Sequence, residues 1–168
     1  GCPNGWTAVA LEGLVTGFGK VTGGVLKNRY PKGLRLLPLR YQDQKALLYL
    51  YRPSELRKDL KDQLAEALLA DAGYPDKGSE QCVAYLARRF RSGGEFPHEV
   101  GLFLSYPPRD VLGFIENRAV NYKCAGLWKV YGDVEQAQRL FAKYRKCTDI
   151  YCELWRAGSG IGQLAVAV

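Results

Sequence analysis

The chain has 168 residues, of which 47% are hydrophobic and 24% are charged, and its formal net charge is +7. This is an ordinary balance for one globular domain with its own core. No uncharged apolar run reaches the roughly 18 residues that span a membrane, and no basic block or known nucleic-acid motif accompanies the charge. We therefore expect no membrane and no nucleic-acid partner.

The cysteine usage points to a reducing compartment. The chain has an odd number of cysteines, and we find no pattern of a secretory signal peptide. Free thiols in the cytoplasm are the expectation for such a chain. The sequence contains no methionine, so we expect the natural N-terminus to be missing or processed.

Residues 1–30 form a glycine-rich segment whose mildly apolar stretch is interrupted by Gly13, Gly17, Gly19, Gly23 and Gly24. Glycine weakens a helix by about 1 kcal/mol relative to alanine. We expect at most a weak helix here, with disorder toward the chain end.

From residue 31 onward the pattern predicts a single α+β domain, residues 31–168. The apolar runs Leu34–Arg40 and Ala46–Tyr51 flank a polar turn and predict a hairpin, with Pro38 favouring a sheet edge. Further strands are expected at 100–105 and 127–131. Helices are expected at about 53–59, 62–72, 79–91, 107–116 and 133–157, the last capped by Asp133. We expect about four strands in one mixed or antiparallel sheet, with helices packed mainly on one face.

Three segments share a strand, a tyrosine, a turn and a helix start: 46–56, 101–111 and 126–136. Common turn chemistry explains most of this likeness. If the strands ran the same way, three helix N-termini would meet at one sheet edge and attract an anion. The candidate binding residues at these junctions are Tyr51, Arg52, Tyr106, Arg109, Lys129 and Tyr131.

Four stretches carry a resemblance to a known family. They are FPHEVGLFLSYPPRDVLGFIEN (Phe96–Asn117), NYKCAGLWKVYGD (Asn121–Asp133), LFAKYRKC (Leu140–Cys147) and LYLYRP (Leu48–Pro53). Residues from about 33 to 168 resemble an uncharacterised bacterial family known as a domain of unknown function. The resemblance implies a stand-alone bacterial cytoplasmic protein and brings no catalytic residues, whereas residues 1–30 do not look like the usual start of the family.

His98 and Cys124 are candidates for catalysis. His98 is the only histidine and could serve as a general base for a Cys124 nucleophile, although a structural histidine is the interpretation that we favour. Cys124, Cys147 and Cys152 are weak candidates for a thiolate metal site, because their spacing lacks the close pairs typical of zinc sites. We predict no cofactor.

The residues thus favour a binding or accessory module for a small anionic ligand or an acidic protein partner. An acidic partner could dock on the basic helix face made by Arg139, Lys143, Arg145 and Lys146. The alternative is an enzyme or a metal or redox protein that uses His98 and Cys124.

Overall fold

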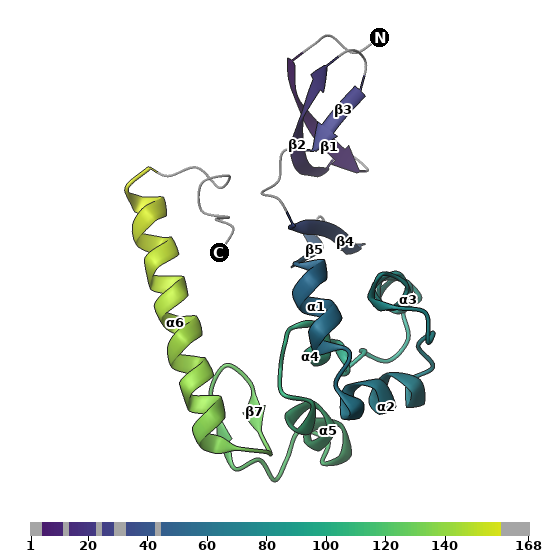
Figure 1. Cartoon of the computed structure of the whole chain (residues 1–168), viewed down its shortest axis with the longest axis vertical. Coiled ribbons are helices and arrows are strands. Elements are labelled where there is room, and N and C mark those ends of the chain that lie inside the picture. The colour runs from purple at the N-terminus through teal and green to yellow at the C-terminus, as the bar shows by residue number, and fades with distance from the viewer. Residues whose placement is uncertain (1–4, 12–13, 23–24, 29–32, 43–44, 159–168) are drawn as a thin grey trace.

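A computed structural model describes residues 5–11, 14–22, 25–28, 33–42 and 45–158 of the chain (Figure 1). The helices are α1 (Pro53–Asp59), α2 (Gln63–Asp71), α3 (Ser79–Arg91), α4 (Val100–Phe103), α5 (Pro108–Glu116) and α6 (Val134–Arg156). The strands are β1 (Gly5–Leu11), β2 (Leu14–Thr22), β3 (Val25–Asn28), β4 (Arg35–Gln42), β5 (Lys45–Tyr51), β6 (Cys124–Ala125) and β7 (Lys129–Val130). The fold is α+β.

The described strands form three small antiparallel sheets, in the orders β1-β2-β3, β4-β5 and β6-β7. The expected four-stranded sheet is therefore not formed. One of its strands is a helix, and another, at 127–131, pairs locally with β6 over two residues. Helices cover the hairpin from one side, where α3 lies against β4.

The glycine-rich segment forms strands, so the expectation of a weak helix was wrong. β1, β2 and β3 pair in chain order, and Gly19 in β2 lies opposite both Thr7 and Asn28. β2 contains two valines and two threonines among its nine residues, and β-branched residues favour strands over helices. We expected disorder only toward the chain end, and this expectation falls on residues 1–4, which lie outside the described residues.

The β4–β5 hairpin is confirmed, and its inner face reaches the core. Tyr49 and Leu39 on this face are 4% and 3% exposed. The register shifts between Pro38 and Arg40, which is a local irregularity of the β4 edge. Pro53 follows directly and starts α1, as its fixed φ favours at the first helical position.

The predicted strand at 100–105 is the helix α4, which is the main correction to the predicted elements. A short apolar run cannot be assigned to strand or helix by periodicity alone. Leu102 and Phe103 are neighbours in sequence and are both buried, which a strand with one buried face would not allow. A Cβ on Gly101 would lie 2.8 Å from Val111 Cγ2, so the missing side chain lets α4 approach α5.

Two clusters of buried side chains form the core. The larger lies among α1–α5 and the hairpin, and the smaller lies between β7 and α6. Tyr106 packs against both clusters. The smaller cluster consists of Trp128, Val130, Ala137 and Phe141.

Asp110 fixes the smaller cluster to the body of the protein. This carboxylate, in the first turn of α5, is 2% exposed. Its Oδ2 accepts a hydrogen bond from Trp128 Nε1 at 2.8 Å, and its Oδ1 accepts from the backbone N–H groups of Tyr131 and Gly132 at 2.8 and 2.7 Å. Three donors compensate the cost of burying the charge.

A second buried carboxylate, Glu99, anchors the entry to α4. Its Oε1 accepts a hydrogen bond from the Tyr74 hydroxyl at 2.8 Å and pairs with Arg89 at 2.5 Å. The Tyr49 hydroxyl donates to the Phe103 carbonyl at 2.6 Å, which satisfies an acceptor at the end of α4. These bonds hold α3, α4 and the hairpin in one unit.

Asp110→Asn tests the role of the buried carboxylate. An amide keeps the shape but presents one oxygen and an NH2 group to three donors, so we expect a loss of about 2 kcal/mol in the free energy of unfolding, measured in urea. Asp133→Asn is the matched control. Asp133 Oδ1 caps α6 by accepting from Gln136 N, and asparagine caps nearly as well, so stability should change by less than about 0.5 kcal/mol. Equal effects of the two changes would contradict the assignment.

Gly126→Ala tests the packing of the smaller cluster. A Cβ at this position would lie 2.2 Å from Phe141 Cε2, so the ring must shift, and we expect a destabilisation of about 1–3 kcal/mol by thermal unfolding. A Cβ on Gly94 would meet nothing within 4 Å. Gly94→Ala should therefore leave the melting temperature nearly unchanged.

Candidate functional site

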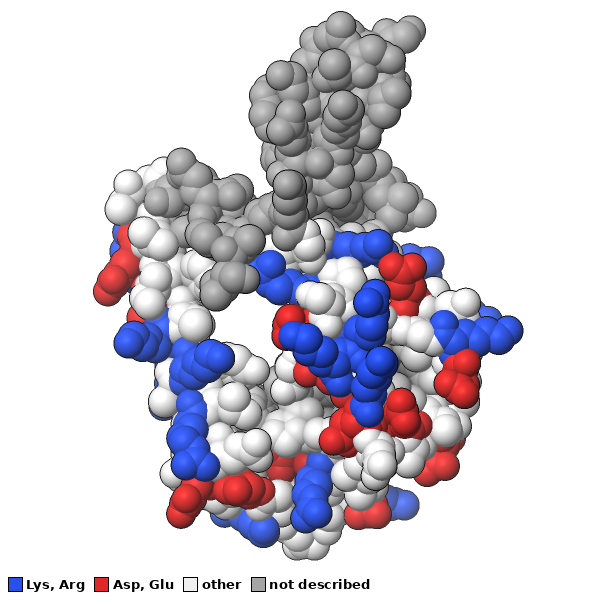
Figure 2. Space-filling view, viewed as in Figure 1, with Lys and Arg blue, Asp and Glu red and all other residues white. Residues whose placement is uncertain are grey.

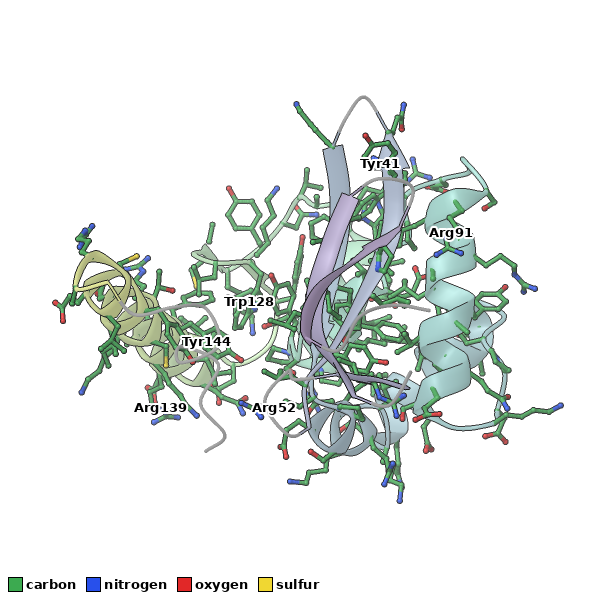
Figure 3. All side chains as sticks on the ribbon, turned by 90° about the horizontal axis from the view of Figure 1, so that it is seen from above. Tyr41, Arg52, Arg91, Trp128, Arg139 and Tyr144 are labelled. Atoms are coloured by element: carbon green, nitrogen blue, oxygen red, sulfur yellow. The ribbon has the colours of Figure 1, made fainter. Side chains whose placement is uncertain are left out.

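A cleft separates the C-terminal half of α6 from the body of the protein. Ala137 and Phe141 in the first half are buried against Trp128 and Val130. Tyr144 is partly covered, with its ring 6.3 Å from that of Trp128 (Figure 3). From residue 145 to 154 every residue is exposed. Figure 2 shows the hollow between this half of the helix and the rest of the molecule.

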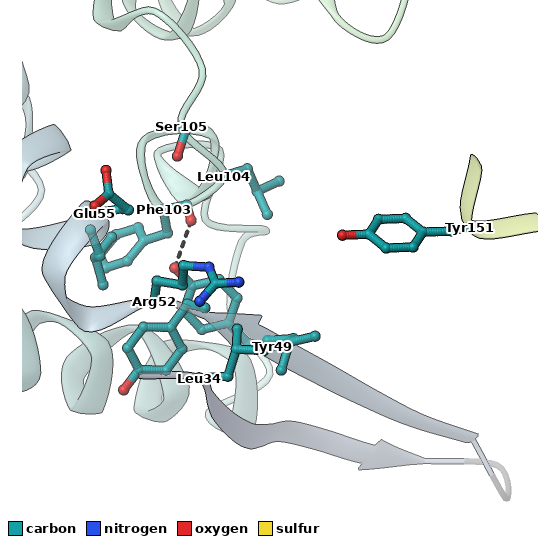
Figure 4. Close-up of a pocket in the computed structure, with 11 residues that line it drawn as sticks. Leu34, Tyr49, Arg52, Glu55, Phe103, Leu104, Ser105 and Tyr151 are labelled. Atoms are coloured by element: carbon teal, nitrogen blue, oxygen red, sulfur yellow. Dashed lines mark hydrogen bonds between the residues drawn. The ribbon is translucent and has the colours of Figure 1, made fainter. Parts of the chain in front are cut away.

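The upper part of the cleft is a cavity of about 560 Å³, within the range of ligand sites. Tyr151 reaches toward it from α6, opposite Leu104 and Arg52 (Figure 4). Tyr51 also lines the cavity and stacks on Tyr49, with ring centroids 4.7 Å apart. We call this space the upper cavity.

The lower part of the cleft is a cavity of about 990 Å³ lined by both α1 and the start of α6. Tyr106 and Arg109 line it, and Tyr106 stacks on Trp128 at 4.5 Å between ring centroids. Acidic side chains line it as well: Asp59, Asp62 and Asp133. We call this space the lower cavity.

Of the three helix N-termini that were expected to attract an anion, that of α6 holds a carboxylate of the chain itself, whereas α1 and α5 have no side-chain cap. A carboxylate also caps α2, which lies between these junctions. Asp62 accepts hydrogen bonds from the N–H groups of Leu64 and Ala65 at the start of α2. Asp133 caps α6 in the same way. Because these donors are occupied and the carboxylates are negative, an added anion would meet repulsion as well as attraction.

The structure separates the six predicted binding residues into three places. Tyr51 and Arg52 line the upper cavity, and Tyr106 and Arg109 line the lower cavity. Lys129 and Tyr131 line neither cavity and contact the loop after α5.

That loop uses both side chains structurally. Lys129 Nζ donates to the Ala119 carbonyl at 2.7 Å and lies 4.9 Å from the centre of the Tyr122 ring. The Tyr131 hydroxyl donates to the Val120 carbonyl at 3.0 Å. The sequence pattern, based on three equivalent junctions, gave no sign of this difference.

Leu50, Leu104 and Tyr151 are among the residues of the upper cavity that the predicted binding residues did not include. Leu50 and Leu104 lie one and two residues before chosen tyrosines, but their apolar side chains suggested core. They are 54% and 44% exposed. The spacing of Tyr144 and Tyr151 on one helical face was the available signal for Tyr151.

His98 and Cys124 line different cavities. His98 is exposed and lies between Phe96 and Phe114, with ring centroids 5.4 and 5.1 Å away. It borders an apolar cavity of about 160 Å³. Cys124 is half-buried and borders another cavity with Phe141.

The thiols of α6 are exposed. Cys147 and Cys152 are free, as are Cys124 and the buried Cys82. Among the described residues, no group of three or more histidine, cysteine, aspartate or glutamate side chains is placed to hold a metal ion.

The outer face of α6 is basic (Figure 2). Between Gln136 and Thr148, α6 carries four cations and no anion: Arg139, Lys143, Arg145 and Lys146. Three of them share the outer face by their spacing, and Arg145 lies to one side, where it borders a cavity with Cys124 and Phe141. All four are exposed, and none forms an ion pair with another residue that the structure describes. None of the helices, as far as they are described, is both long and apolar enough to cross a bilayer.

Burial raises the pKa of several tyrosines around the cleft. The pKa of Tyr144 is raised by burial first and then by the charge of Asp59, and burial also raises that of Tyr106. The pKa values of Tyr49 and Tyr74 are raised much further by burial, helped at Tyr74 by its hydrogen bond to Glu99. These hydroxyls therefore stay protonated and act as donors at neutral pH.

Comparison with known proteins gives two family matches. A model described as "Protein of unknown function (DUF3793)" matches residues 25–165. A second, described as "Methyltransferase RsmF PUA domain", matches residues 2–36. No curated protein and no solved structure matches.

The raised tyrosine pKa values predict a loss of stability in alkali. An unfolded tyrosine ionises near pH 10, whereas folded Tyr49 and Tyr74 hold their protons to higher pH. The contribution of these two tyrosines to the free energy of unfolding is thus complete below about pH 10 and is lost as pH rises beyond it.

Tyr74→Phe should make this alkaline loss shallower, measured by urea unfolding between about pH 9 and 11, a window centred on the unfolded tyrosine pKa. Tyr41→Phe is the control, because Tyr41 is 49% exposed. If stability falls equally steeply with pH in both variants, the raised pKa of Tyr74 does not explain the alkaline loss.

Proposed function

The chain belongs to a family of proteins of unknown function (DUF3793), and we propose from its own surface that it is a bacterial cytoplasmic accessory module that binds an acidic protein partner along α6. The observation that carries this proposal is the combination, on one helix, of a basic outer face and an uncovered apolar stripe that follows it toward the helix C-terminus.

The basic face supports an acidic partner. Three exposed cations lie within four residues of α6: Lys143, Arg145 and Lys146. Neighbouring like charges repel each other when no anion lies between them. An acidic surface would relieve this repulsion and would be steered toward the helix over a distance of about 10 Å at moderate salt.

The apolar stripe supports a protein rather than a small solute. Ile150, Tyr151 and Leu154 are 44%, 47% and 41% exposed on the half of α6 that leaves the body. Protein interfaces combine an apolar or aromatic centre with a polar rim, and tyrosine is enriched in their centres. Apolar side chains flanked by cations match this arrangement.

The small-anion version has less support. The cations that line the lower cavity, Lys58 and Arg109, share it with three aspartates, and Lys58 pairs with Glu55 at 3.0 Å. The alternative of an enzyme or redox protein is also weaker, because His98 and Cys124 border separate cavities.

Charge reversal on α6 tests the proposal. We expect Lys143→Glu with Lys146→Glu to weaken partner binding about tenfold, because each exposed charge contributes up to about 1 kcal/mol. Partners are covalently cross-linked in the native cell extract and quantified by mass spectrometry. Binding of each purified partner is then measured by calorimetry at two salt concentrations.

Lys61→Glu with Lys77→Glu is the matched control, with the same change of charge on exposed residues elsewhere. Lys61 borders a cavity between α2 and α3, away from α6. The proposal fails if the α6 variant and the control recover the same proteins in equal yield.

A further inference from the structure

The cavity beside His98 has walls made mainly of aromatic rings. Its volume is about 160 Å³, close to the roughly 150 Å³ of a cavity that holds one benzene molecule. The rings come from the loop before α4, from α5 and from the segments that precede α5 and β7: Phe96, His98, Tyr106, Phe114 and Trp128. We call this space the aromatic cavity.

The rings at one side of the aromatic cavity are inclined to one another. The His98 ring lies at 54° to that of Phe96 and at 55° to that of Phe114, with centroids 5.4 and 5.1 Å apart. Rings inclined in this way form a concave wall instead of a flat stack. A cation in the concavity can lie within about 6 Å of more than one ring centroid, which is the range of cation–π attraction.

The aromatic cavity has an exposed rim and a buried floor. Phe96 and Leu104 at the rim are 54% and 44% exposed, and His98 is exposed as well. Val111 and Asp110 in the lining are buried. A small solute can therefore enter from the surface and bring one group against the buried lining.

The charges around the aromatic cavity disfavour an anion. Its described lining contains no lysine or arginine and one carboxylate, that of Asp110. The upper and lower cavities and the cavity beside Cys124 each have an arginine in their lining: Arg52, Arg109 and Arg145. In a chain of net charge +7, the aromatic cavity thus has the opposite local balance, which suits a cation.

The state of Asp110 indicates which kind of cation fits. Both of its oxygens already accept hydrogen bonds, from Trp128 Nε1 and from the N–H groups of Tyr131 and Gly132. The wall therefore has little capacity for the three N–H donors of a primary ammonium, and burying donors without partners is costly. A quaternary ammonium has no N–H group, and aromatic rings are the groups that recognise it.

We propose that the aromatic cavity binds the quaternary ammonium group of a small cationic solute of the choline type. Phe96, His98 and Phe114 surround the alkyl groups, and the buried charge of Asp110 favours the positive charge without a direct hydrogen bond. The lone histidine then serves as an aromatic wall. The site uses no residue of the basic face of α6, so it is independent of the proposed acidic partner.

The test compares ligands of matched shape on the full chain at about pH 8, where an ordinary imidazole is uncharged. The NMR signal of the Trp128 indole N–H reports binding, because this group lines the cavity and bonds Asp110. 3,3-Dimethyl-1-butanol has the shape of choline, with carbon in place of nitrogen and no charge. We expect choline to bind about tenfold more tightly, because it alone of the two gains the attraction of the rings and the carboxylate.

Two further ligands test the charge and the donors separately. Ethanolamine carries a primary ammonium, and glycine betaine adds a carboxylate to the quaternary ammonium. Both should bind more weakly than choline, the first for lack of acceptors and the second for lack of a cation in the described lining.

Phe96→Leu removes one ring and keeps an apolar side chain at an exposed position. It should weaken choline about fivefold and leave 3,3-dimethyl-1-butanol nearly unchanged. Phe114→Leu should act in the same way. Tyr41→Leu is the matched control, since it removes a ring that is 49% exposed on β4 and does not line the cavity, and it should change neither affinity.

The proposal is overturned if choline leaves the Trp128 signal unmoved, or if choline and its carbon isostere bind equally. Equal effects of Phe96→Leu and Tyr41→Leu on choline affinity would also overturn it. Sedimentation of the protein with phosphatidylcholine vesicles, without binding of free choline, would assign the group to a lipid headgroup and reject the small solute.

Discussion

The position of α6 depends on the buried carboxylate of Asp110. It binds the indole of Trp128 and two backbone N–H groups of the β7 turn, and Trp128 in turn packs against Tyr106 and Phe141. A charge placed among these groups is stable only while all three donors are present. The carboxylate therefore fixes β7 on α5, and β7 fixes the start of α6.

That anchor reaches only the first half of the helix. Contacts with the smaller cluster end at Tyr144, whereas α6 continues to Arg156. The cleft follows from this mismatch, because the anchored end sets the direction of the helix and no described element supports the other end. The uncovered stripe and the two cavities are thus consequences of one buried interaction near the base of α6.

The sequence predicted those elements whose signals are local. Pro53 starts α1, Asp62 and Asp133 cap α2 and α6, and two short apolar runs around a polar turn define the hairpin. The segment 100–105 carried no such signal, because its burial on all sides comes from the packing of Gly101 against Val111. The partners of Lys129 and Tyr131 were equally unpredictable, since both depend on how the loop after α5 folds back. The spacing of Tyr144 and Tyr151 was visible, but only the structure shows that the body covers one and leaves the other 47% exposed.

The C-terminal half of α6 needs a further contact to be stable as a helix, and this limits how the protein can use it. An isolated helix shorter than about 12–15 residues is marginal in water, and most helical stability in proteins comes from packing of an apolar face. Residues 145–154 are all exposed and have no such packing against the described body. The three cations of residues 145–156, with two acidic residues, Asp149 and Glu153, give only weak local support. A contact on Tyr151 and its neighbours would therefore stabilise the helix as well as cover apolar surface. The order of this segment of α6 would then depend on whether a partner is bound.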